Sequence, residues 1–123
     1  MQAIPELIPQ MIADRYLAAL TELVSVARDA VAADSSPQSS LWQRKLLPLL
    51  ERQLFAMKSA SAHYAIGNQQ PLVGQALESR FLARDMDGYP LNFAGEDFAA
   101  RLKEKRQLVV FAAWRVCQSA GVV

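Results

Sequence analysis

The feature that most restricts the fold of this 123-residue chain is the recurrence of apolar residues at steps of three and four along most of its length. Such spacing places the apolar side chains on one face of an α-helix. The composition agrees, because alanine and leucine, which favour helices, contribute 20 and 16 residues, whereas only five glycines are present. The sequence therefore predicts an all-α fold.

Four segments carry this pattern, and breaks rich in proline, glycine or serine separate them. We expect helices at about 9–33, 41–66, 71–84 and 96–119, each with one apolar stripe. Short connections between helices favour antiparallel neighbours. The chain is therefore predicted to form a single helical domain, 1–123, folded as a roughly antiparallel bundle of four main helices.

Pro48 interrupts the second of these segments. Proline inside a helix removes one hydrogen bond and clashes with the preceding turn, so this helix should be kinked or split at Pro48. The apolar spacing continues across the proline, which favours the kink. Upstream, residues 34–40 are predicted to be a linker, and Ser40 with Gln43 fits a capping box at the start of the helix.

Two later segments allow more than one structure. Residues 85–95 should form a loop that packs on the core, and its two aspartates with Gly88 partly match a calcium loop. Alanine stands where the first and last ligands of such a loop belong, so we predict a turn instead. Residues 108–111 could form a strand, but the helical pattern that runs through them favours a helix.

The residues that could carry catalysis or bind metal are few. His63 is the only histidine and Cys117 the only cysteine, and no glycine-rich phosphate loop or nucleophile elbow is present. We expect no catalytic residue, no metal site and no cofactor; His63 should be a structural or surface residue, and Cys117 a small buried apolar residue. The enzymatic alternative is a general base at His63, or a small-ligand cavity near His63, Tyr64 and Arg80.

Charge and hydropathy exclude several classes of protein. Thirteen Lys/Arg and twelve Asp/Glu are spread along the chain, so no general attraction to nucleic acid or to an anionic membrane is predicted. The longest apolar run, 108–114, is far shorter than the roughly 20 residues that cross a bilayer. The first residues do not resemble a secretory signal, and one cysteine allows no internal disulfide. We therefore expect a cytoplasmic protein with no membrane partner.

The densest group of charges lies in the last helix. Its cations are Arg101, Lys103, Lys105 and Arg106. One interpretation is a phosphate-contacting face, which would make the protein a nucleic-acid-associated regulator. The other is the solvated face of a helix, with weak surface ion pairs. The second is favoured, because no aromatic residues are interleaved with the run.

The last helix also carries more apolar side chains than one core can bury, and the start of the second helix raises the same question. The residues concerned are Leu41, Trp42, Leu108, Phe111 and Trp114. Some should contact a partner, in a homo-oligomer interface or a groove for a client helix, unless the core covers them all. The sequence thus favours a non-enzymatic protein-interaction module, an adaptor, regulator or small chaperone, acting as a homodimer.

Overall fold

The computed structural model describes residues 7–122, which contain six helices and no strand. The three long helices are α1, α3 and α6, and three shorter ones connect them. Their bounds are α1 Gln10–Ala33, α2 Pro37–Gln43, α3 Leu46–Ala65, α4 Gln70–Ser79, α5 Leu82–Met86 and α6 Glu96–Ser119. Within residues 7–122, every helix is too short or too polar to cross a lipid bilayer.

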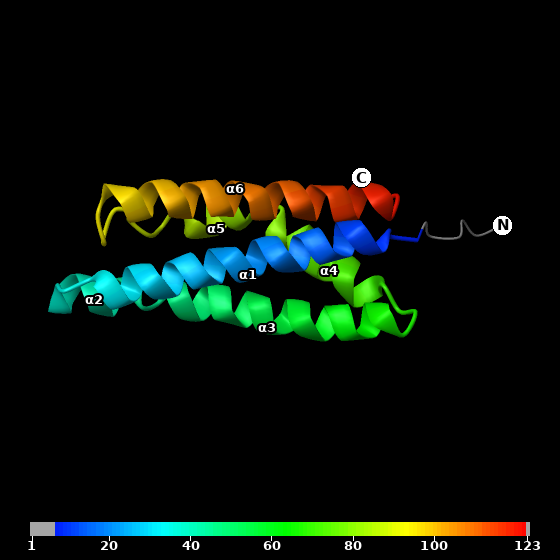
Figure 1. Cartoon of the computed structure of the whole chain (residues 1–123), viewed down its shortest axis with the longest axis horizontal. Coiled ribbons are helices and arrows are strands. Elements are labelled where there is room, and N and C mark those ends of the chain that lie inside the picture. Colours follow the sequence, from blue (N-terminus) through cyan, green and yellow to red (C-terminus); the bar gives the residue numbers. More distant parts are fainter. Residues whose placement is uncertain (1–6, 123) are drawn as a thin grey trace.

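The helices form a four-cornered bundle in which the chain direction alternates (Figure 1). Helix α1 packs against α3 and α6, and α4 packs against the same two helices from the opposite corner. Helices α2 and α3 together make one bent arm, and α4 with α5 makes another. The predicted all-α, roughly antiparallel bundle of four main helices is confirmed.

The core lies along the axis of the bundle, where the apolar stripes of the four arms meet. The first and last predicted helices match α1 and α6 closely, and residues 108–111 are helical. Large side chains from all four arms are fully buried there: Leu20, Leu23, Leu50, Met57, Leu72, Leu82 and Leu102. Burial of these stripes stabilises the helices more than intrinsic propensity does.

The second predicted helix is split, but the break lies at Arg44–Lys45 rather than at Pro48. The ring of a helical proline clashes with the carbonyl four residues earlier, which here belongs to Arg44. The chain avoids that clash by turning at Arg44 and starting α3 at Leu46. Pro48 then lies in the first turn of α3, where its missing N–H needs no partner within the helix.

Two other boundaries differ from the predictions. The expected linker at 34–40 is wrong in its second half, because α2 begins at Pro37 and the hydroxyl of Ser36 accepts a hydrogen bond from the Ser39 N–H. Ser40 is buried inside α2 and caps no helix, so the predicted capping box is also wrong. The third predicted helix is interrupted after Ser79, and α5 extends it to Met86.

Two glycines should respond in opposite ways to replacement by alanine. Gly67 ends α3 with φ of +94°, and the Asn68 N–H bonds the His63 carbonyl across it. Gly67→Ala should lower the free energy of unfolding by about 1 kcal/mol, because a Cβ disfavours positive φ. Gly74→Ala, inside α4 with open space around it, should raise that free energy by about 0.5–1 kcal/mol. Urea unfolding of both variants measures the difference, and a shift of the same sign in both would contradict it.

Candidate interaction surfaces

An apolar groove of about 330 Å³ lies on the outer face of the bundle between α1 and α6. We call it the α1/α6 groove, and it is lined by Ile12, Arg15, Ala18, Ala19, Glu22, Leu108, Phe111, Ala112 and Arg115. Leu108 is 43% exposed and Phe111 59% exposed, although both belong to a helix that also supplies the core. Two of the five predicted interaction residues therefore share one exposed surface.

The acidic and the basic residues of this groove lie at opposite ends of it. The ammonium of Lys105 lies 3.2 Å from a carboxylate oxygen of Glu22, which fixes the relative level of the antiparallel helices α1 and α6. Arg15 and Arg115 consequently lie toward the other end of the groove, two turns and more from that pair. Three alanines separate the two ends, so a second helix could approach the backbone closely.

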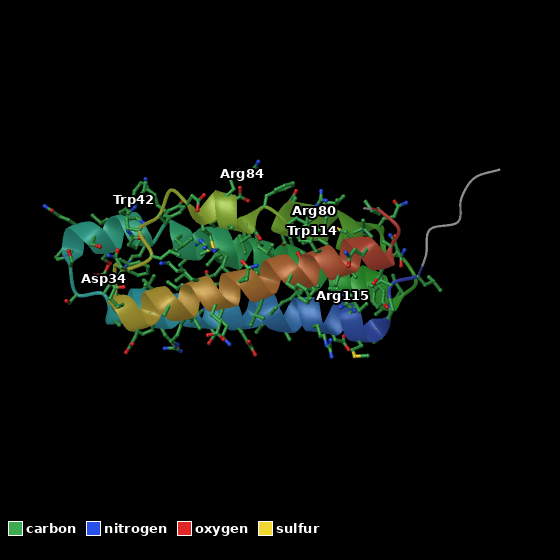
Figure 2. All side chains as sticks on the ribbon, turned by 90° about the horizontal axis from the view of Figure 1, so that it is seen from above. Asp34, Trp42, Arg80, Arg84, Trp114 and Arg115 are labelled. Carbon is green, nitrogen blue, oxygen red and sulfur yellow. The ribbon has the colours of Figure 1, made fainter. Side chains whose placement is uncertain are left out.

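Trp114 does not join this surface. Its side chain is half-buried, and the guanidinium of Arg80 lies over its ring, 4.7 Å from the centroid. Figure 2 shows Trp114 beside Arg80, whereas Arg115, the next residue of α6, lines the α1/α6 groove. Such a contact between a cation and an aromatic ring links the end of α4 to α6.

Leu41 and Trp42 lie in α2, toward the opposite end of the bundle from Trp114 (Figure 2). Leu41 is 74% exposed, and the Trp42 ring packs against Tyr89, with 5.4 Å between the centroids. Beside them is a hollow of about 500 Å³, which we call the basic concavity; it is lined by Leu41, Arg44, Lys45, Pro48, Arg52 and Tyr89. The predicted apolar surface is therefore divided among three places.

The predicted phosphate-contacting residues of α6 are also divided. Arg101 packs over the Phe98 ring, and Lys105 pairs with Glu22 of α1. Lys103 and Arg106 point to another side, where they line a hollow that also contains Asp87 and Glu96. The four cations do not form one basic face, and binding of nucleic acid stays a prediction.

The candidate catalytic residues engage separate structural partners. His63 is exposed in the last turn of α3, and its Nδ1 donates to the Ser59 carbonyl at 2.9 Å. The Tyr64 hydroxyl donates to the carbonyl of Ile8, and Arg80 lies over Trp114. Within residues 7–122 no three His, Cys, Asp or Glu side chains are close enough together to hold a metal ion.

One buried polar cluster was not predicted from the sequence. The Tyr16 hydroxyl, fully buried in α1, donates to the Gln75 carbonyl at 3.1 Å and shares a short hydrogen bond with the Ser79 hydroxyl of α4. Burial raises the pKa of Tyr16 above its ordinary range, an effect that the hydrogen bond to Ser79 opposes. A tyrosine within an apolar stripe was the only signal in the sequence, because a buried hydroxyl needs a hydrogen-bond partner. The partner, Ser79, lies 63 residues away in the sequence, so no local pattern identifies it.

Cys117 is buried next to this cluster, as the sequence predicted. Burial raises the pKa of the Cys117 thiol, and the charge of Arg80 only partly opposes that effect. A thiol with a raised pKa carries little thiolate near neutral pH, and the thiolate is the nucleophile. The geometry thus gives Cys117 the properties of a small apolar core residue.

Comparison of the chain with protein-family models, with curated proteins and with solved structures finds no significant match. The chemistry of the exposed residues is therefore the basis for assigning a function.

Proposed function

We propose that this chain is a non-enzymatic protein-interaction domain, an adaptor, regulator or small chaperone, that forms a homodimer through the α1/α6 groove. The observation that carries the proposal is the exposure of Leu108 and Phe111 beside a floor of alanines. Exposed apolar surface of this kind marks protein interfaces, and buried aromatic side chains dominate their energetics. The single buried thiol supports the further proposal of a reducing, cytoplasmic location.

The spacing of charges along α1 favours a second copy of the chain as the occupant. Arg15 and Glu22 are seven residues apart, so they lie two turns apart on the same side of the helix, with Ala18 and Ala19 midway between them. A two-fold axis that crosses α1 at these alanines brings two α1 helices together antiparallel. Each Arg15 then lies opposite Glu22 of the other copy, which is the self-complementarity that an isologous interface requires.

Helix α6 supplies the exposed apolar residues near this axis. The ion pair between Glu22 and Lys105 puts Ala18 and Ala19 about level with Leu108 of the antiparallel α6, so the axis passes close to Leu108 and within one turn of Phe111. Phe111 of each copy then lies near the middle of the interface, where truncation of an aromatic side chain has its largest effect. A net charge of +1 adds little repulsion between the copies.

Phe111→Ser is the variant that tests this proposal, and Phe55→Ser is its control. Both phenylalanines are exposed, at 59% and 77%, but Phe55 lies on the outer side of α3. We expect sedimentation equilibrium to give the wild type twice the 13.6 kDa monomer mass at micromolar concentration. Phe111→Ser should weaken the dimer by about 30-fold or more, the effect of losing a central aromatic contact.

Phe55→Ser should leave the dimer unchanged. A wild-type protein that stays monomeric up to high micromolar concentration would contradict the proposal. Equal weakening by both variants would also contradict it, because the interface would then not be centred on α1 and α6.

A further inference from the structure

The basic concavity combines three cations with exposed apolar side chains. It lies where α2 turns into α3, and Arg44, Lys45 and Arg52 line it without any acidic residue. Leu41, Pro48 and Tyr89 supply the rest of its wall. A hollow with this lining attracts an anion and also offers it apolar contacts.

The helix pair that forms most of this concavity is basic, although the whole chain is almost neutral. Residues 37–65, which comprise α2 and α3, contain four Lys/Arg and a single acid, Glu51, which is a net charge of +3. Glu51 is already bonded to Arg28 of α1 at 3.0 Å. Among residues 7–122, no carboxylate pairs with the three cations of the concavity, whereas Arg84 and Lys105 elsewhere each have one.

Two of these cations also lie where the dipole of α3 repels positive charge. Lys45 is the N-cap of α3, and Arg44 precedes it, at the end of the helix where the backbone dipole is positive. Acidic residues normally occupy the first turn, but α3 has none there. A bound anion would relieve this repulsion, which adds to the attraction by the side chains themselves.

The apolar part of the lining indicates which class of anion fits. The ring of Trp42 packs on Tyr89, the ammonium of Lys45 lies 5.4 Å from its centroid, and Trp42 is not among the residues that line the concavity, so the lining itself offers little aromatic surface for stacking on a base. Leu41 and Pro48 are exposed beside the cations instead. Aliphatic surface of this kind can pack against an apolar side chain of a ligand. A protein segment with both carboxylates and an apolar side chain therefore fits the cations and the aliphatic residues of the concavity.

We propose that the basic concavity binds an acidic segment of a partner protein, whose carboxylates contact Arg44, Lys45 and Arg52 and whose apolar side chain packs on Leu41 and Pro48. The site lies on α2 and α3, away from the α1/α6 groove. Binding of the segment and self-association of the chain are therefore independent, and Phe111→Ser should keep its affinity for the segment.

The probe is a fluorescein-labelled peptide in which glutamate alternates with leucine, and a glutamine–leucine peptide is its uncharged counterpart. Arg44→Gln/Arg52→Gln removes two cations of the concavity, and Arg84→Gln/Arg101→Gln removes two exposed arginines elsewhere. Anisotropy at low salt should show about tenfold or greater loss of affinity for the first pair and less than about twofold for the second. Emission of Trp42 in a Trp114→Phe background should change on binding and report contact at this site.

Four outcomes would overturn the proposal. They are no binding of the acidic peptide at low salt, equal affinity for the uncharged peptide, equal loss in both arginine pairs, and tighter binding of an oligothymidylate than of the acidic peptide. The last outcome would assign the concavity to nucleic acid instead. Circular dichroism of both arginine pairs controls for folding, and each pair alters only surface residues.

Discussion

Replacing Leu20 by alanine should lower the free energy of unfolding by about 3 kcal/mol, the effect of removing a large buried side chain that its neighbours cannot fully replace. Leu20 is fully buried in the middle of α1, the helix that packs against both α3 and α6. The cavity left behind would face the axis of the bundle, where the four arms meet. Urea unfolding followed by circular dichroism measures the change.

Leu41→Ala makes the same chemical change at a side chain that is 74% exposed. Its effect on the free energy of unfolding should stay below about 0.5 kcal/mol, because no packed contact is removed. The two variants compare the loss of stability on replacing a buried leucine with the loss on replacing an exposed one. Similar losses in the two variants would mean that Leu41 is covered within the folded protein, and would contradict its role in the basic concavity.

Alkaline pH should destabilise the protein through Tyr16. Burial raises the pKa of this phenol in the folded state, while the unfolded chain has the ordinary value of 10.0. The folded protein therefore holds a proton that the unfolded chain releases. Its stabilising contribution is complete below about pH 10 and is lost as the pH rises further, at a slope that approaches 1.4 kcal/mol per pH unit.

Tyr16→Phe removes this titrating group. Near neutral pH the variant should lose about 1–2 kcal/mol, because the Ser79 hydroxyl and the Gln75 carbonyl lose a buried partner. Between about pH 10 and about pH 11.5 its stability should fall less steeply than that of the wild type. The Cys117 thiol, whose pKa burial also raises, is present in both proteins, and its charge adds to the rise of the Tyr16 pKa. Parallel stability curves above about pH 10 would contradict the assignment to Tyr16.

The ends of the long helices could be predicted from sequence because the signals are local. Helix α6 begins where two acidic residues follow Gly95 and ends near Gly121, and a continuous apolar stripe connects the two points. The break in the second arm could be predicted only in part. Pro48 indicates that the helix is interrupted, but whether the chain kinks at the proline or turns at Arg44 depends on which arrangement lets α3 pack on α1 and α4.

The candidate surfaces show the same division. Helical periodicity alone separates Arg101 and Lys105 from Lys103 and Arg106, which lie on different sides of one helix. That α1 brings Glu22 to Lys105 is decided by tertiary packing. Leu108, Phe111 and Trp114 could all be identified from the sequence as apolar residues beyond those that the core needs. Only the structure separates Trp114 from the other two, because its ring packs against Arg80.

By itself, the sequence determined that this protein is a bundle of four helical arms, because the spacing of apolar residues acts within one or two turns. It also indicated a surplus of apolar side chains, without deciding whether the core, a second copy or another partner covers them. Only the tertiary structure decided where the excess lies, in the α1/α6 groove, under Arg80 and beside the basic concavity. Those positions depend on contacts between residues far apart in the chain, which no local pattern specifies.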